Sequence, residues 1–372
     1  MIYLDNAATT IPDNEALEYA KIYNENCFFN PSALYKGGLN NKKEIDKAKT
    51  TLLNSLSALK HEVIFTSCGT ESDNMAIFGT FKRGVFVTTE GEHSAVYKSA
   101  LELKNRGFTV LFAKLNKDGS VNQEDLLNLV KNNNVTMVSI VHVNNETGAI
   151  NDINLISKKI KVINPSIIFH SDGVQSYLKI PYKISDTVDL YSISAHKVNA
   201  LKGTGALIKK KGLNINPIIF GGGQENGLRS GTENIFGIKV LEYCINKKHK
   251  DITYNFNNVS ILRNRFLSLI NKDLFTIISG ESSSPYILCL AANGVKGEVV
   301  LHMLEEFDII IGNGSACSSK NRYSRVIEAC GYKNNDGIIR ISFSTETTIE
   351  EITYVTEKLN EVTLKLKNIM KR

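Results

Sequence analysis

The stretch EVIFTSCGTESDNMAIFG, residues 62–79, decides the fold, because it passes from an apolar strand into a helix through a single glycine. Residues 62–67 are rich in β-branched and aromatic side chains, which is typical of a buried strand. Gly69 allows a sharp turn, and Thr70 with Asp73 three residues later resembles a capping box at a helix start. A strand followed closely by a helix is the repeating unit of an α/β protein.

The same alternation continues from about residue 60 to residue 210. Strands are predicted at residues 62–67, 84–89, 109–115, 135–143, 166–172, 189–195 and 205–210. Helices are predicted between several of them, including residues 94–107, which end at Gly107, and residues 123–132. Near-continuous apolar strands separated by helices predict a mostly parallel seven-stranded sheet that is covered on both faces.

The pattern changes near residue 250. A helix at about residues 255–271 precedes two apolar strands, a helix at 297–307, a third strand within 336–344 and a final helix from about residue 348. This order predicts a smaller α+β domain at the C-terminal end. We therefore expect the chain to divide into an arm (1–14), a large domain (15–252) and a small domain (253–372).

Composition excludes several classes of protein. With 372 residues, 42% of them hydrophobic, the chain can bury a large core, and a net charge of +6 without a concentrated basic face argues against nucleic-acid binding. We see no secretory signal and no apolar run long enough to span a membrane. Six cysteines lie far apart without a CxxC pair, so we expect no metal site, no disulfide framework and a reducing, cytoplasmic location.

Polar and ionisable residues follow five of the predicted strands, where α/β proteins bind ligands. These residues are Thr70, His93, Asn145, Asp172, Gln175, His196 and Lys197. One such residue would mean little, because caps, surface lysines and structural histidines are common. Together they indicate a site along one edge of the sheet.

The start of the helix after Gly69 suits a phosphate, because free N–H groups and the helix dipole favour an anion there. An ordinary capped helix would show the same residues. The chain has neither the Gly-x-x-x-x-Gly-Lys pattern of a P-loop nor a Gly-x-Gly-x-x-Gly after a strand. A phosphorylated cofactor smaller than ATP or NAD therefore fits better.

Lys197 and Asp172 suggest which cofactor that is. Lys197 follows an apolar strand, so partial burial would favour its neutral amine, which can form a Schiff base; a surface lysine is the alternative. Asp172 can pair with a protonated pyridine nitrogen. Gln175 could reach a ring oxygen, and His93 could lie on the ring or shuttle protons. A Schiff-base lysine, a pyridinium carboxylate and a phosphate-binding helix start together indicate a pyridoxal 5′-phosphate (PLP) enzyme.

Ten motifs then carry a resemblance to a known family. They are YLDNAATT (3–10), NPSALYKGG (30–38), FTSCGTESDN (65–74), EH (92–93), HVNNETG (142–148), HSDGVQ (170–175), SAHKVNALKGTGAL (194–207), GGGQENGLRSGTEN (221–234), GSACSS (314–319) and IRIS (339–342). In this order they resemble the cysteine desulfurases of the class V aminotransferase-like, fold-type I PLP family.

The resemblance implies a role for each matched residue. Lys197 would be the Schiff-base lysine, Asp172 the partner of the pyridine nitrogen, Gln175 a contact of the ring hydroxyl, and His93 and Asn145 neighbours of the ring. The phosphate would be held by Gly69, Thr70, Ser194 and His196. Thr232 would reach the phosphate of the neighbouring subunit, which implies a homodimer.

The resemblance also implies the reaction. Arg340 with Asn30 would grip the carboxylate of L-cysteine, and Cys317, on a loop of the small domain, would take its sulfur as a persulfide and leave L-alanine. The arm, residues 1–14, would pack with the small domain. The sulfur would then pass to an acceptor protein, such as an iron–sulfur scaffold or a tRNA-thiolation protein.

The other cysteines are expected to play no part. Cys244 and Cys289 lie in apolar runs and should be packed, whereas Cys27 and Cys330 lie near the ends of elements and should be partly exposed. Cys68 is the serious competitor, because it lies beside the predicted phosphate turn. Two other functions remain open: another PLP enzyme of this fold, such as an aminotransferase or selenocysteine lyase, and a non-catalytic scaffold.

Overall fold

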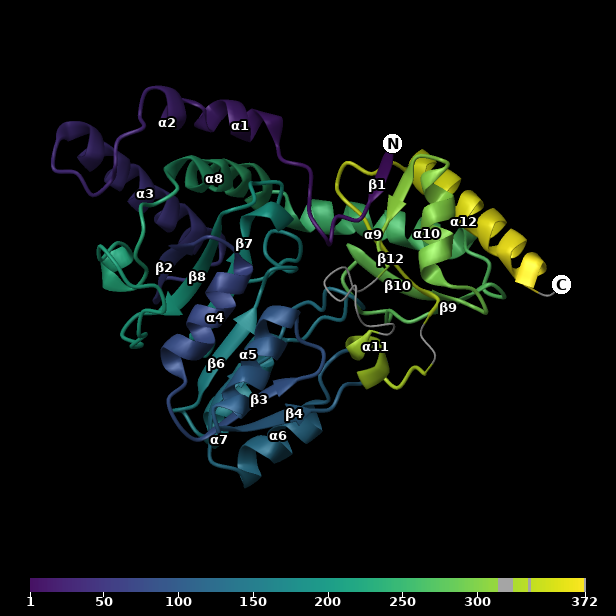
Figure 1. Cartoon of the computed structure of the whole chain (residues 1–372), viewed down its shortest axis with the longest axis horizontal. Coiled ribbons are helices and arrows are strands. Elements are labelled where there is room, and N and C mark those ends of the chain that lie inside the picture. The colour runs from purple at the N-terminus through teal and green to yellow at the C-terminus, as the bar shows by residue number, and fades with distance from the viewer. Residues whose placement is uncertain (314–323, 334–335, 371–372) are drawn as a thin grey trace.

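The computed structural model describes residues 1–313, 324–333 and 336–370. Figure 1 shows two groups of elements side by side: a purple-to-teal group around a large sheet, and a green-to-yellow group around a small sheet. The N-terminal strand is the exception, because it lies among the elements of the second group.

The large sheet has seven strands in the order β2-β8-β7-β6-β5-β3-β4. They are β2 (His61–Thr66), β3 (Val85–Thr89), β4 (Thr109–Ala113), β5 (Val135–Ser139), β6 (Ile168–Asp172), β7 (Leu190–Ser194) and β8 (Gly205–Lys210). β8 runs antiparallel to β2 and β7, and the other paired strands are parallel. The prediction of a mostly parallel seven-stranded sheet is therefore confirmed.

Helices cover both faces of this sheet. Val63 and Phe65 of β2 belong to one hydrophobic cluster, whereas Ile64 between them belongs to another on the opposite face. Helices with buried residues in the first cluster are α1 (Asn14–Ala20), α3 (Lys36–Ser55), α6 (Gln123–Asn132), α7 (Ile153–Ile163) and α8 (Ile235–His249); those in the second are α4 (Gly69–Thr80) and α5 (Ser94–Asn105). Burial on both faces explains why the strands read as apolar runs.

The predicted stop of one helix is also found. α5 ends at Asn105, and Gly107 has a φ of +87°, a conformation that suits glycine. The short α2 (Ile22–Glu25) joins α1 to α3, and single 3-10 turns occur at Ala195–Lys197 and Glu225–Gly227.

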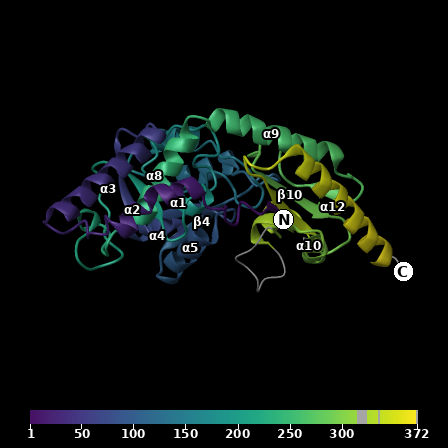
Figure 2. The ribbon, with the colours of Figure 1, turned by 90° about the horizontal axis from the view of Figure 1, so that it is seen from above.

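The second group surrounds a three-stranded antiparallel sheet, β12-β10-β9. Its elements are α9 (Ile252–Leu269), β9 (Phe275–Ile277), β10 (Ile287–Ala292), α10 (Gly297–Glu305), β11 (Ile309–Ile311), α11 (Arg325–Ala329), β12 (Ile338–Ser342) and α12 (Ile349–Met370). In the view from above, α9 and α12 lie along one side of the small sheet (Figure 2). α9 begins about three residues earlier than predicted, and the division of the chain at residues 14 and 252 stays a prediction.

The N-terminal segment connects to this second group. β1 (Ile2–Leu4) pairs in parallel with β11, and Asp5 forms a bridge with Ser342 at the end of β12. Within the described residues, no helix is both long and apolar enough to cross a membrane.

Candidate active site

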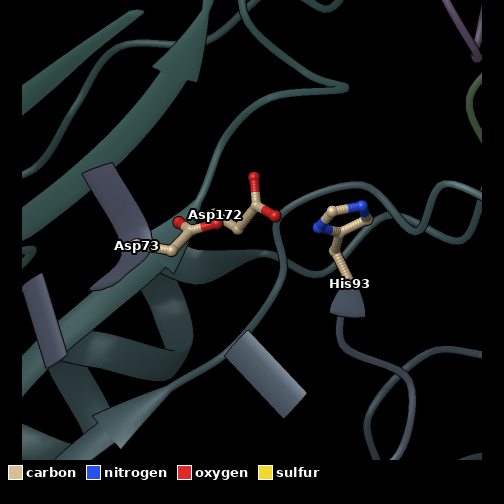
Figure 3. Close-up of side chains that lie close together, drawn as sticks. All are labelled: Asp73, His93 and Asp172. Atoms are coloured by element: carbon tan, nitrogen blue, oxygen red, sulfur yellow. The ribbon is translucent and has the colours of Figure 1, made fainter. Parts of the chain in front are cut away.

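Three ionisable side chains meet at the carboxyl edge of the large sheet. Asp172 ends β6, His93 follows β3, and Asp73 lies in the first turns of α4. Their carboxylate and imidazole atoms lie within 4.8 Å of one another. Figure 3 shows Asp172 between Asp73 and the imidazole of His93. Side chains of these types at such distances can also bind a metal ion, but the absence of a metal site stays our expectation.

The two carboxyl groups differ in their surroundings. Both are buried. Burial raises the pKa of Asp172, whereas the nearby His93 and Lys197 lower it, and the backbone N–H of Val174 donates to its Oδ1 at 2.9 Å. Burial and the neighbouring Asp172 raise the pKa of Asp73 well above its ordinary value. The pKa of both carboxyl groups is raised, that of Asp73 further, so Asp73 is the one that holds its proton more strongly.

The histidine beside Asp73 does not neutralise it. His170 Nε2 lies 3.5 Å from the Asp73 carboxylate, but burial lowers the pKa of His170 to about 3, so its ring is neutral. Its two nitrogens lie 2.8 Å from Ser139 Oγ and 3.0 Å from Ser192 Oγ. His142 is likewise buried, with its pKa lowered to about 3. Both histidines pack in the interior.

Lys197 reaches the site from the turn that follows β7. Its half-buried side chain places Nζ 2.6 Å from the carbonyl oxygens of Ala7 and Ala8, to which it donates. The amine is therefore held at the carboxyl edge of the sheet by the N-terminal segment. No sequence pattern indicates this contact, because the acceptors are backbone atoms of two alanines.

His93 has a structural role that the sequence did not indicate. Its Nδ1 accepts a hydrogen bond of 3.2 Å from the N–H of Ala95 and so caps α5. Burial is the main cause that lowers the pKa of this imidazole. The cap fixes the ring in a neutral form, with Nε2 as the remaining nitrogen.

The predicted capping box at α4 is wrong. The helix begins at Gly69 with Cys68 as its N-cap, so Thr70 lies inside the first turn, and Asp73 faces the sheet. Glu71 is the acidic residue that stabilises the turn between β2 and α4 instead. Its carboxylate accepts from Ser67 N at 2.8 Å and from Arg229 Nε at 2.8 Å.

Gly69 is required by close packing at this helix start. A Cβ at this position would lie 2.7 Å from Val174 Cγ2 and 3.3 Å from Ser194 Cβ. The first N–H groups of α4 have no partner within the helix and are exposed to the edge of the sheet. Because Arg229 neutralises Glu71, the anion-binding capacity of this helix start remains available.

The other predicted ring and phosphate residues lie around the same edge. Gln175 is buried, and its Nε2 donates to Ala7 O at 2.8 Å. Asn145 has a buried Oδ1 with no hydrogen-bond partner among the described residues. His196 Nδ1 lies 3.1 Å from Thr9 Oγ1, and burial lowers the pKa of this histidine to about 4. Ser194 is buried at the end of β7.

Of the two predicted substrate residues, Arg340 is tied to the site by its hydrogen bonds, whereas the role of Asn30 stays a prediction. Arg340 is buried on β12 and donates to Asp5 Oδ1 at 2.7 Å and to Asn145 O at 2.9 Å. Asn30 is exposed, and its Oδ1 accepts from Ser32 N at 2.9 Å. Among the hydrogen bonds of the described residues, none joins Asn30 to Arg340. Thr232 is also exposed.

Cys317 lies outside the described residues. Among the others, Cys244 and Cys289 are buried as predicted, and burial raises the pKa of Cys244 to about 12. The expectation of a partly exposed Cys330 is wrong: this thiol is buried, and burial raises its pKa to about 12. Cys68 is half-buried, with Ser67 Oγ at 3.7 Å from its sulfur.

These residues fit PLP by their own chemistry. Asp172 offers a buried carboxyl group to a ring nitrogen, and Asn145 offers a buried oxygen that lacks a partner among the described residues. Lys197 offers an amine on the same edge, and the start of α4 offers N–H groups to a phosphate. The neutral His93 adds a flat aromatic ring beside Asp172 (Figure 3).

Comparisons with known proteins agree with this chemistry. The family model of class-V aminotransferases matches residues 2–355. A protein of Dictyoglomus turgidum named cysteine desulfurase IscS is 35% identical, over 99% of this chain and 96% of its own. A solved NifS-like protein superposes with a TM-score of 0.91 at 30% identity, over 98% of this chain and all of its own. A structure described as SspA in complex with cysteine has a TM-score of 0.80 at 26% identity, over 94% of this chain and all of its own.

Proposed function

Because this chain belongs to the class-V aminotransferase family, we infer that it is a PLP-dependent cysteine desulfurase that moves sulfur from L-cysteine to Cys317. The observation that carries this conclusion is the buried Asp172 carboxylate, which lies beside His93 and on the same edge as Lys197. A buried carboxylate is costly unless a cation neutralises it. A protonated pyridine ring is the cation that this arrangement suits.

The cofactor would be held by a covalent bond, by contacts with its ring and by contacts with its phosphate. Lys197 would be joined to it covalently, and Asp172 would pair with its ring nitrogen. Gln175 and Asn145 would contact the ring from the sides, and His93 would lie against its face. The phosphate would be bound by the start of α4 at Gly69 and Thr70, with Ser194 and His196. When bound, PLP withdraws electrons from the α-carbon of an amino acid.

The chain's own residues would do the rest of the chemistry. Arg340 would bind the carboxylate of L-cysteine, with help from Asn30. Lys197 Nζ would take the proton from the substrate's α-carbon. Because Nδ1 of the neutral His93 accepts from the N–H of Ala95, its ring hydrogen lies on Nε2, and His93 would take the thiol proton at Nδ1 once this hydrogen bond opens. Such a base is needed because an ordinary thiol is only a few per cent ionised at neutral pH.

The sulfur transfer balances without another reactant. The thiolate of Cys317 attacks the sulfur of L-cysteine, the carbon–sulfur bond breaks, its electron pair goes to the carbon, and the carbon takes up one proton, equal to the one that the Cys317 thiol gave up. The products are L-alanine and a persulfide on Cys317. The outer sulfur can then pass to the thiol of an acceptor protein, for which we propose an iron–sulfur scaffold or a tRNA-thiolation protein.

We also propose that the enzyme is a cytoplasmic homodimer. The exposure of Thr232 in the single chain supports a role for this residue at the partner's cofactor. The free thiols of Cys27, Cys68, Cys244, Cys289 and Cys330 suit a reducing compartment.

The test compares wild type, Cys317→Ala and Cys68→Ala after brief exposure to L-cysteine. Wild type and Cys68→Ala should form alanine and carry one extra sulfur atom on the peptide that contains Cys317, detected by mass spectrometry. Cys317→Ala should retain PLP and bind L-cysteine but form no alanine. Extra sulfur on Cys68 would contradict the role of Cys317. Alanine formation without Cys317 would favour another PLP enzyme of this fold, such as a selenocysteine lyase.

A further inference from the structure

Lys179 is a buried lysine beside the site that the proposed function does not use. It lies in the turns after β6 and is 7% exposed. Its Nζ donates a hydrogen bond of 3.0 Å to Gln175 Oε1. Burial is the main cause that lowers its pKa well below the ordinary value, and the positive charges of Lys197, Lys248 and Arg340 act in the same direction.

Gln175 links this lysine to the cofactor lysine. Its Nε2 donates to Ala7 O at 2.8 Å, and the same carbonyl accepts from Lys197 Nζ at 2.6 Å. Because a carbonyl can only accept, the nitrogen of Gln175 must face Ala7, and its oxygen must face Lys179. One N–H of this amide is used by Ala7, and the second remains for a ligand.

We propose that Lys179 is a positioning residue that fixes the carboxamide of Gln175 with its N–H side toward the cofactor. The proposal rests on the proposed function and deepens it, since Gln175 is the residue assigned to the ring oxygen. An N–H donated to that oxygen stabilises its anionic form. The opposite orientation would present a carbonyl oxygen to an anion and would also face the Ala7 carbonyl.

The choice of lysine for this task has a physical reason. Lys197 and Arg340 already place two positive groups at this edge. A buried lysine with a strongly lowered pKa donates a hydrogen bond without adding a third charge. Lys179 can therefore orient Gln175 without adding a positive charge next to the cofactor.

The test uses Lys179→Met in the PLP-loaded enzyme and measures the pH midpoint of the cofactor's visible absorbance. We expect the midpoint to rise by about one pH unit, the effect of one hydrogen bond on an ionisation. The reason is that a ring oxygen without its donor holds the shared proton to higher pH. The dissociation constant of PLP should rise about tenfold. A folded Lys179→Met enzyme with the wild-type midpoint would overturn the proposal.

Lys209→Met is the matched control. Lys209 is also buried and lies one residue before the end of β8. Its Nζ donates to Leu213 O at 2.8 Å and forms an ion pair with Glu62. Both methionine variants should melt at a lower temperature than wild type. Only Lys179→Met should move the absorbance midpoint. An equal shift in Lys209→Met would mean that a general loss of folding stability is the cause, and not the loss of the contact with Gln175.

A double-mutant cycle tests whether Lys179 acts through Gln175. Gln175→Met should move the midpoint by itself, and Lys179→Met should add nothing in that background; additive shifts would contradict the proposal. If Lys179→Met does not fold, Lys179→Gln, which keeps an N–H donor, must retain the wild-type midpoint while Gln175→Met shifts it. These readouts are spectroscopic, so they stand apart from the alanine and persulfide assays that test the proposed function.

Discussion

Arg340 donates a hydrogen bond of 2.7 Å to Asp5, so the guanidinium that we propose for the substrate carboxylate already contacts a carboxylate of the N-terminal segment. Its other terminal nitrogen donates to the carbonyl of Asn145 at 2.9 Å. The two contacts come from segments more than a hundred residues apart, and together they fix the plane of the guanidinium. A fixed plane is what bidentate binding of a carboxylate requires.

Arg340→Lys should raise the KM for L-cysteine about tenfold or more, because lysine keeps the charge but lacks the planar fork. Steady-state alanine formation measures this, and the cofactor spectrum should not change. Asp5→Asn is the matched variant: it keeps an acceptor oxygen for Arg340, so its KM should change less. An unchanged KM in Arg340→Lys would mean that the substrate carboxylate binds elsewhere.

Asp172→Asn and Asp73→Asn should differ sharply in turnover, although the two carboxyl groups are neighbours. Asp172 would carry a negative charge when it pairs with the protonated ring nitrogen, so its amide variant should lose at least about a hundredfold in kcat. Asp73 holds a proton because its pKa is raised well above the ordinary value, and asparagine resembles a protonated acid. Asp73→Asn should therefore keep roughly wild-type turnover and absorbance. The reverse ranking would exchange the roles of the two residues.

Glu92→Gln should stabilise the protein increasingly as the pH rises. Burial raises the pKa of Glu92 to about 8, whereas an unfolded glutamate ionises near 4.3. Between these values the folded state holds a proton that the unfolded state has lost, so this group's contribution to the free energy of unfolding falls with rising pH. Glutamine has no such proton. Urea unfolding at several pH values from about 5 to about 8 measures this. The free energy of unfolding of the variant, relative to wild type, should rise over this range by a few kcal/mol at most. Glu90→Gln, an exposed neighbour, should show no such gain.

Thr232 should act on the partner's cofactor, which a mixed dimer can test. Thr232→Ala should weaken PLP binding roughly fivefold, the effect of one hydrogen bond. In a dimer of one Lys197→Ala chain and one Thr232→Ala chain, one complete site remains if Thr232 acts across the interface. That site should then bind PLP with wild-type affinity. Weakened binding in the mixed dimer would place Thr232 in its own subunit's site.

The sequence was sufficient for the large sheet and for most of the site. Strand propensity and near-continuous apolar runs gave all seven strands, because strands buried on both faces carry the strongest signal. The carboxyl-edge rule then placed Asp172, His93 and Lys197 together, and the structure has them there. The signal was weaker at the start of α4, where Thr70 and Asp73 mimicked a capping box.

What the sequence could not predict depends on contacts between distant segments. Cys330 is buried and lies near enough to Cys289 of β10 to raise the pKa of that thiol, which its position near a helix end does not reveal. The hydrogen bonds of Lys197 to Ala7 and Ala8 use backbone oxygens, which have no sequence signature. Lys179 was missed for a related reason, since a lysine in a turn is ordinarily exposed.

The N-terminal segment also constrains when the site can form during synthesis. Asn6 Nδ2 donates to Ser342 O at 3.0 Å, and Ala7 N donates to Ser342 Oγ at 2.9 Å, across 336 and 335 residues of sequence. On the ribosome, Ser342 is made 335 residues after Ala7. The carbonyl that receives Lys197 can therefore reach its final position only after the strand that ends at Ser342 has been translated. A nascent chain that already has its large sheet would still lack a finished cofactor site, so PLP would be captured only once the small sheet has also formed.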